Sequence, residues 1–514
     1  MGHRSHPAPT PLLFGYDPGR DLPADHLARL VELVVEEATL PRSLPAGRGQ
    51  PAFDPRLCAK VLLYGYATGA RSSRQLERLC SDSLPFLFLT RGDAPSYRTL
   101  CSFRVQHTDV IEQVWLQLFG VAERAGMKRL GRVVLDSSKL RADAGPEAVL
   151  KRREFQPFLD HLRSALKEAQ ESDARDEADP PGQARTGQPA DTAQMRELLR
   201  SVRRQIARER KAVLGEEASA EPAARPPLGP RMEPRIKAAS AAVEAAQEAG
   251  GGFVCVTDPD ACMMGEGREK RIHECHSYEV AVDEDAGLLV VGRASQSPVD
   301  NPRLEPLLEA AALLEPGGIR SVTADSGYYG GDAVGRLLGA GIDVCIPDSN
   351  TAGDLHRGQP IGTIRSASRG SVALEYDAEA DCYRCPEGNA LLRSGRRQDC
   401  GQSVGVYRAE RPCTGCPLAK DCLTQAGAKH RTVKRGEYAD ILEAARQRFG
   451  EPAHQDRYHR RGSAVETVFG FLRSALGFHR WSVRGKDRVA SEARLFSMAY
   501  QLRKAHVKWS QTMS

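Results

Sequence analysis

The stretch His-Ser-Tyr-Glu-Val-Ala-Val-Asp at residues 276–283 alternates in the manner of a β-strand, as does Leu-Leu-Val-Val-Gly-Arg-Ala-Ser at residues 288–295. The Glu-Asp-Ala-Gly between them is a good hairpin turn, so we expect two antiparallel strands. Apolar spacing further along the chain predicts a helix at residues 301–315 and a strand at 319–325. It then predicts a second helix at 330–340 and a second strand at 342–347. This region is therefore predicted to be a compact α/β unit.

Two segments outside this region complete the pattern. Residues 132–140, Arg-Val-Val-Leu-Asp-Ser-Ser-Lys-Leu, form an apolar run typical of a strand, and residues 461–473 are typical of a helix start. The order strand, hairpin, helix, strand, helix, strand is that of an RNase H-like domain, with the helix around Glu466 as its last major helix. We therefore predict an α/β fold (α+β overall), an RNase H-like mixed sheet with helices. It is interrupted by a helical insertion and a cysteine-rich insertion, and an all-helical N-terminal domain precedes it.

The predicted organisation has six segments. The first is a helical N-terminal domain (residues 1–125), whose helices fit a helix-turn-helix-like DNA-binding module and a plain helical bundle equally well. The first strand of the core (130–146), a charged helical insertion (147–250) and the RNase H-like core (251–350) follow. A cysteine-rich insertion (351–435) and C-terminal helices that complete the core (436–514) come last. In the N-terminal part, we expect Asp54, followed by Pro55, to cap one helix and Ser73 to cap another. Pro- and Gly-rich stretches at 178–189 and 221–230 predict mobile joints in the helical insertion.

Composition and charge bound the class of protein. Of the 514 residues, 41% are hydrophobic and 27% are charged, as in globular proteins with a buried core. No stretch approaches the ~20 apolar residues of a membrane span, and the N-terminus lacks the apolar core of a secretion signal. We therefore expect a cytoplasmic protein with no membrane partner.

The net charge of +5 permits nucleic-acid binding without requiring it. Basic and aromatic residues interleave between residues 429 and 512, for example in Arg-Tyr-His-Arg-Arg and Phe-His-Arg-Trp. This mixture suits phosphate contacts combined with base stacking, although a solvated basic helical surface has a similar composition.

Three acidic residues lie in settings that suit a metal site. Asp136 lies within the 132–140 strand, Asp325 ends the 319–325 strand, and Glu466 lies on the C-terminal helix. Each acid alone is weak evidence, because a buried or edge aspartate is about equally common. Strands and helices can, however, hold carboxylate oxygens a few ångströms apart, and these are the ligands that Mg²⁺ takes. Together the three acids predict a two-metal phosphoryl-transfer site.

Six of the thirteen cysteines crowd into residues 382–422. They are Cys382, Cys385, Cys400, Cys413, Cys416 and Cys422. Two Cys-x2-Cys pairs about 30 residues apart have the spacing of a structural zinc site in a reducing compartment. Four thiolates suffice for zinc, so the choice among the six stays open, as does incidental clustering.

Several of these motifs resemble the DDE transposases of bacterial insertion sequences. Leu-Tyr-Gly-Tyr, Ser-Ser-Arg-Gln-Leu-Glu and Thr-Leu-Cys-Ser-Phe-Arg, between residues 63 and 104, are similar to the N-terminal helical domain of that family. The run from Tyr458 through Arg461 and Glu466 to Arg473 resembles the family's Tyr-Arg-Glu-Lys motif. It departs from that motif in two ways: four residues rather than three separate Arg461 from Glu466, and Arg473 replaces the usual Lys. Arginine keeps the positive charge and grips phosphate with two bonds, so we expect phosphate binding to survive.

The resemblance implies a function and a set of site residues. It implies catalysis of DNA cleavage and strand transfer by Asp136, Asp325 and Glu466 with two Mg²⁺ or Mn²⁺ ions. Double-stranded DNA, as element ends and as target, would be the partner, and a homodimer would form on it. The implied residues that hold DNA phosphates are Tyr458, Arg461 and Arg473. The implied ligands of a structural zinc are Cys385, Cys413, Cys416 and Cys422, with Cys382 as an alternate.

Two other functions share these features. A transposase-derived protein could bind DNA while the acids are inert, and an RNase H-like nuclease would cleave DNA without joining strands. The role of the helical insertion is open in all three cases.

Overall fold

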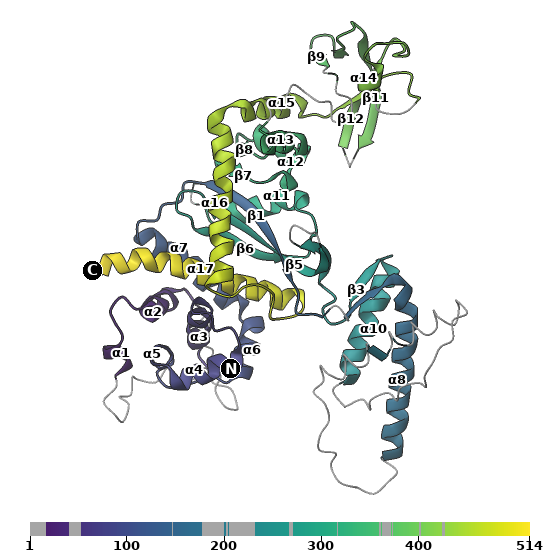
Figure 1. The fold of residues 1–514 in the computed structure, drawn as a ribbon. Helices are drawn as coiled ribbons and strands as arrows, with labels where there is room; N and C mark the ends of the chain where they lie inside the picture. Colours follow the sequence, from purple (N-terminus) through teal and green to yellow (C-terminus); the bar gives the residue numbers. More distant parts are fainter. Residues whose placement is uncertain are drawn as a thin grey trace.

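The computed structural model describes most of the chain, namely residues 17–40, 53–145, 148–176, 200–201, 204, 232–266, 271–315, 317–358, 361, 372, 374–399, 402–423 and 427–513. The elements are helices and mixed sheets, so the predicted α+β class is confirmed (Figure 1). The predicted mobile stretches at 178–189 and 221–230 lie outside the described residues. In the described part of the chain, no helix has both the length and the apolar character needed to cross a membrane.

A central sheet carries the predicted hairpin. Its path is β6 (Leu289–Ser295), β5 (Arg271–Asp283), β1 (Arg132–Arg141), β7 (Ser321–Thr323) and β8 (Asp343–Cys345), and β4 (Cys262–Glu266) also pairs with β5. The β5–β6 and β1–β5 pairs are antiparallel, whereas the β1–β7 and β7–β8 pairs are parallel. Because β1 and β6 each run antiparallel to β5, the strands β6, β1, β7 and β8 all point the same way.

Helices cover both faces of this sheet, and the alternation along β1 shows how. Val133 and Leu135 belong to a core that includes α11 (Leu304–Ala312) and α12 (Gly331–Gly339). Val134 and Leu140 point the other way, into a core shared with α16 (Pro452–Ser474) and α17 (Lys486–Met513). Even-numbered residues of β1 therefore face α16, and Asp136 is one of them.

The N-terminal helices share the second of these cores. They are α1 (Pro18–Asp21), α2 (Leu27–Glu37), α3 (Pro55–Ala67), α4 (Ser73–Asp82), α5 (Leu84–Thr90), α6 (Tyr97–Gln106) and α7 (Thr108–Arg124). Asp54 caps α3 and Pro55 occupies its first position, as predicted. The prediction of Ser73 as a cap was wrong by one residue, because Ser72 keeps the extended backbone and Ser73 is already helical. Helices α3 and α7 pack against α17, so the two ends of the chain bury one continuous apolar interior.

The helical insertion has a core of its own. The short strands β2 (Val149–Lys151) and β3 (Phe253–Cys255) pair, and the turn η2 (Arg152–Glu154) leads into α8 (Phe155–Asp176), which packs on α10 (Met232–Glu248). Buried residues from these elements, including Phe158 and Ile236, form a cluster separate from the sheet cores. Figure 1 shows this pair of helices standing away from the central sheet.

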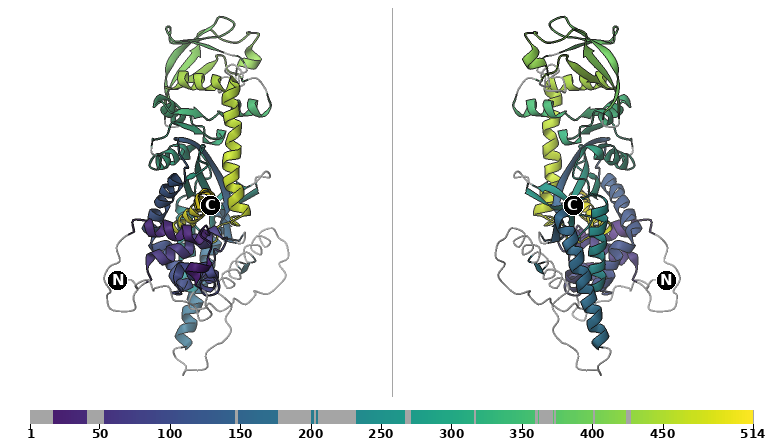
Figure 2. Two further views of the ribbon diagram at one scale, coloured as in Figure 1. Left: turned by 90° about the vertical axis from the view of Figure 1, so that its left-hand side faces the viewer. Right: turned by 90° about the vertical axis from the view of Figure 1, so that its right-hand side faces the viewer.

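The cysteine-rich segment is a second, antiparallel sheet that the sequence analysis did not predict. Its strands run in the order β13, β12, β11, β10, β9, with bounds Thr432–Arg435, Gln402–Ala409, Ala390–Asp399, Cys382–Arg384 and Glu375–Asp377. Helix α14 (Ala419–Cys422) lies between β12 and β13 in the sequence, whereas α13 (Ser349–His356) and α15 (Ala439–Gln447) flank the segment and α15 packs on α12 of the central unit. The long helix α16 starts near this sheet and runs down to the central core (Figure 2).

The separate core of the insertion generates the first prediction. Phe158 is fully buried in that core, and replacing a buried phenylalanine with alanine typically costs about 3–5 kcal/mol. Phe158→Ala should therefore raise amide hydrogen exchange in α8, α10, β2 and β3 while β1 and β5 keep their protection. Phe253→Ala is the matched control, because that ring is 49% exposed on the same unit. Loss of protection that spreads to β1 and β5 would contradict two independent cores.

A buried acid beside the central sheet generates the second prediction. Burial and the neighbouring Asp283 carboxylate raise the pKa of Glu315 to about 7. Below pH 4.5 both the folded and unfolded chains are protonated here, and between pH 4.5 and 7 only the unfolded chain loses its proton. The unfolding free energy that the protonated Glu315 contributes is therefore lost as the pH rises from 4.5 to 7.

The neutral variant Glu315→Gln should escape this loss. At pH 8 the unfolding free energy of the variant, measured by urea denaturation, should exceed that of the wild type by up to about 3 kcal/mol. The difference should shrink at pH 5. Glu309→Gln, an exposed change on the preceding helix α11, should show no such pH dependence. A gain that is equal at both pH values would refute this explanation.

Candidate functional site

The parallel pairing of β1 with β7 brings two aspartates level with each other. Val134 of β1 lies opposite Thr323 of β7, so Asp136 and Asp325, each two residues further along, lie at the same height. Neighbouring strands are about 4.8 Å apart. Asp325 follows the end of β7 and caps the turn η4 (Ser326–Tyr328), where its Oδ1 accepts a 3.0 Å hydrogen bond from the Gly327 N–H. The two sequence-predicted aspartates therefore meet at the carboxyl edge of the sheet.

Asp136 lies in an environment that disfavours an isolated negative charge. Burial is the largest cause that raises its pKa, to about 6, and the carboxylates of Asp325 and Asp300 raise it further. Two contacts act in the opposite direction: the Ser137 N–H donates to Oδ1 at 2.7 Å, and Arg461 Nη1 lies 3.7 Å from Oδ2. A bound cation would relieve the remaining repulsion among these acids.

Helix α16 lies over this edge and supplies the predicted basic residues. Arg473 Nη2 donates a 2.6 Å hydrogen bond to Ser138 Oγ of β1. The Arg461 guanidinium stacks 5.4 Å from the centre of the Tyr458 ring, whose pKa burial raises. All three side chains therefore border the aspartate pair, with Arg461 in direct contact with Asp136.

Glu466 is on the same helix but makes no such contact. Its side chain is exposed, and no hydrogen bond or ion pair joins it to Asp136 or Asp325 within the described residues. It lies seven residues, about two turns, before Arg473, so both project from nearly the same side of α16. In the part of the chain that the structure describes, no three His, Cys, Asp or Glu side chains are close enough to hold a metal ion.

A further acid that the sequence analysis missed joins the aspartate pair. Asp300 Oδ1 accepts a 2.7 Å hydrogen bond from Ser137 Oγ. A Cβ built on Gly327 would meet Asp325 Oδ1 at 3.0 Å and Asp300 Oδ2 at 3.3 Å. The two carboxylates therefore flank the same glycine, and a side chain at Gly327 would crowd both.

Strand direction was the available signal for Asp300. It lies in the loop that follows β6, and β6 points the same way as β1 and β7, so all three loops emerge at one edge. Beneath this loop, Glu279 is 1% exposed and accepts bonds from Arg303 Nε at 2.7 Å and Arg293 Nε at 3.0 Å. This buried charge cluster anchors the residues beside Asp300.

Four of the predicted zinc ligands line one cavity of about 220 Å³ in the second sheet; they are Cys385, Cys413, Cys416 and Cys422. The Asn389 N–H points at Cys385 Sγ at 3.3 Å, and the Arg431 N–H at Cys413 Sγ at 3.4 Å. Such donors favour sulfur that carries negative charge. Cys382 is instead buried on β10 and is not part of this lining, while Cys400 lies outside the described residues.

Comparison with protein families identifies both ends of the chain. Residues 17–106 match the family model described as a transposase domain (DUF772), and residues 384–506 match the transposase DDE domain. No curated protein matches the chain. The first match covers α1 to α6, and the second covers the cavity-lining cysteines and Glu466, while Asp136 and Asp325 lie between the two matches. The two matches together support a DDE-type transposase of an insertion element.

Proposed function

We propose that this transposase cleaves DNA at the ends of its element and joins the freed strands to target DNA. Asp136, Asp325 and Glu466 are the proposed ligands of two Mg²⁺ or Mn²⁺ ions. The observation that carries the proposal is the β1–β7 register, which holds two aspartates level at the carboxyl edge of a sheet. Ligand sites in open α/β sheets form at that edge.

The strand order also supports an RNase H-like core for this activity. Three strands that are antiparallel to their neighbours (β6, β5, β1) are followed by two that run parallel to β1 (β7, β8). The six-segment division predicted from the sequence is part of the proposal, with the helical insertion and the cysteine-rich sheet as two interruptions of that core.

The donor atoms at the site are of the kind that divalent metal ions take, and Glu466 would have to approach the aspartates to complete the set. Carboxylate oxygens are the hard donors that Mg²⁺ prefers. Burial, with the neighbouring carboxylates of Asp325 and Asp300, raises the pKa of Asp136, so a bound cation would stabilise its charged form. Bound metal ions supply a nucleophile at neutral pH and stabilise the leaving oxygen of a phosphodiester.

The chain's own basic residues have a separate task. Arg461 contacts Asp136 and is oriented over the Tyr458 ring, so it can hold a phosphate next to the aspartates. Arg473 is held by Ser138 on the same edge. A guanidinium binds phosphate with two parallel hydrogen bonds. These side chains would therefore orient the scissile phosphate.

One observation favours a second function. Glu466 is exposed, and no three acids of the described residues are close enough to hold a metal ion, which suits a DNA-binding protein whose acids are inert. We favour catalysis because Glu466 projects on the Arg473 side of α16, from which a long side chain can reach the β1 edge. An RNase H-like nuclease would share the site and differ in its products. The proposed partner is double-stranded DNA, bound by a homodimer at the nucleoid.

The third prediction tests catalysis directly. Asp325→Asn should reduce Mg²⁺- or Mn²⁺-dependent cleavage of the element's terminal DNA by roughly a hundredfold or more, because it removes a charged ligand. Binding of the same DNA, measured by mobility shift, should persist. Asp332→Asn, on α12 beyond the site, is the matched control and should cleave normally.

Sequencing of the products separates the proposed functions. Joined strands indicate a transposase, and cut but unjoined strands indicate a nuclease. Wild-type protein that binds DNA but never cleaves it in either metal would leave the DNA-binding protein as the better account.

We also propose that the cysteine cavity holds a structural zinc ion. Cys385, Cys413 and Cys416 line the cavity from loops, and Cys422 lines it from the end of α14. Zinc would draw these four thiols closer together than the described residues hold them. Two of the sulfurs already face backbone N–H donors. Because the core of this sheet is small, a metal ion would contribute substantially to its folding.

The fourth prediction concerns the metal content. Purified protein should carry about one zinc per chain by elemental analysis, and Cys413→Ser should lose it along with hydrogen-exchange protection of β11 and β12. Cys382→Ser should keep the zinc, because Cys382 does not line the cavity. Wild-type protein that is folded but free of zinc would exclude the metal, and zinc lost from Cys382→Ser but kept by Cys413→Ser would overturn the ligand assignment.

A further inference from the structure

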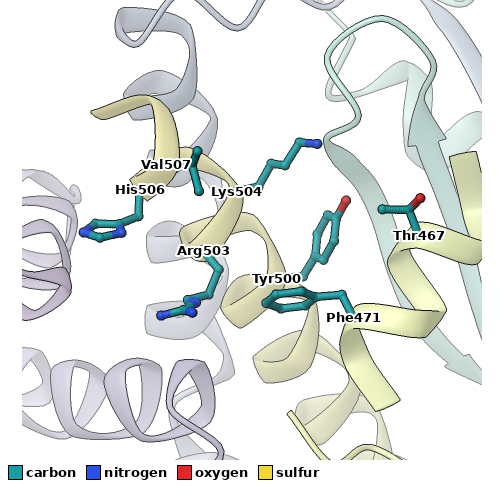
Figure 3. Close-up of a pocket in the computed structure, with 7 residues that line it drawn as sticks. All are labelled: Thr467, Phe471, Tyr500, Arg503, Lys504, His506 and Val507. Atoms are coloured by element: carbon teal, nitrogen blue, oxygen red, sulfur yellow. The ribbon is translucent and has the colours of Figure 1, made fainter. Parts of the chain in front are cut away.

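A cavity of about 410 Å³ opens between α16 and α17, on a flank of α16 that none of the proposed site residues occupies (Figure 3). Phe471 and Tyr500 form its aromatic wall, with Val507 beside them, and Arg503 and Lys504 lie at its margin. This volume falls within the range of about 300–1,000 Å³ typical of small-ligand sites.

The aromatic wall is held in place. The Phe471 and Tyr500 rings meet edge to face, with centroids 5.7 Å apart at 78°. The Tyr500 hydroxyl donates a 3.1 Å hydrogen bond to the Gly287 carbonyl. This bond fixes the position of the ring. A flat apolar ligand therefore meets a rigid surface, and little ordering is needed on binding.

The margin of the cavity carries only positive charge. Neither Arg503 nor Lys504 forms an ion pair with any residue that the structure describes, and no acid lines the cavity. Figure 3 shows the two side chains extending to different sides of the aromatic pair. The complementary ligand is flat and apolar at its centre and anionic at its edges, which describes a nucleotide.

The cavity also lies close to the proposed catalytic residues. Thr467, which lines it, directly follows Glu466. Phe471 is five residues beyond Glu466, which corresponds to about 7.5 Å along the helix axis and a different side of the helix. A DNA strand held at the Glu466 side can therefore reach the cavity only by passing around α16, a path longer than one nucleotide.

From these observations we propose that the cavity binds one unpaired nucleotide of the DNA substrate. Its base stacks against the Phe471 ring beside the buried Tyr500, and its phosphates contact Arg503 and Lys504. Base–aromatic stacking and cationic contacts are the usual means of holding single-stranded DNA. This inference rests on the proposed function, since it assigns a substrate feature to the same enzyme, and it identifies unpaired DNA as the preferred form.

The fifth prediction compares two DNA probes of the same sequence in metal-free buffer, where cleavage is excluded. One probe is a blunt duplex, and the other has a four-nucleotide single-stranded overhang that carries 2-aminopurine. The wild type should bind the overhang probe about fivefold or more tightly and should quench the 2-aminopurine fluorescence by stacking. Arg503→Glu should abolish this preference while blunt-duplex binding remains.

Two further variants make the outcome decisive. Lys508→Glu changes the charge equally at an exposed position that does not line the cavity, and it should keep both the preference and the quenching. Val507→Glu places a carboxylate in the cavity at a residue that is 58% exposed, so folding should survive while the preference is lost.

Equal binding of both probes by the wild type, without quenching, would overturn the inference. So would equal effects of Arg503→Glu and Lys508→Glu on both probes, because Arg503 would then be an ordinary phosphate contact. Metal-dependent cleavage measured on the same preparation would show whether the proposed function stands when the inference fails. Absence of binding to either probe would contradict both.

Discussion

The parallel pairing of β1 with β7 is the constraint on which the site depends. Only three residue pairs join these strands, from Arg132 opposite Ser321 to Val134 opposite Thr323, yet they set the height of Asp136 relative to Asp325. A slip of one residue would turn Asp136 away from α16 and toward the opposite core. The buried neighbours Val133 and Leu135 prevent that slip because they fill the other face.

Electrostatics then determine what this edge of the sheet can bind. Three aspartates gather there, and burial makes their charges costly, as the raised pKa values of Asp136 and Asp300 show. Arg461 offsets part of this cost from α16. The site is therefore an acidic centre bordered by basic side chains, an arrangement that suits a phosphodiester held next to metal ions.

The sequence predicted the elements with strong local patterns. The 276–295 hairpin, the helix capped by Asp54, and the placement of Asp136 within a strand and of Asp325 just beyond one all follow from alternation, caps and turns. Asp300 was missed because nothing local distinguishes it, and only the common direction of β6 and β1 brings it to the site. The shared core of α3, α7 and α17 was also missed, since it depends on contacts between residues hundreds of positions apart. The approach of Glu466 to the aspartates remains a prediction.

The most direct test of this account is a crystal structure of the protein with Mn²⁺ and a DNA end, with the metals located by anomalous scattering. The account predicts two ions roughly 3.5–4 Å apart, bound by Asp136 and Asp325, with the Glu466 carboxylate as a further ligand. Metal ions bound elsewhere, or a Glu466 side chain directed away from ions held by the aspartates, would contradict it.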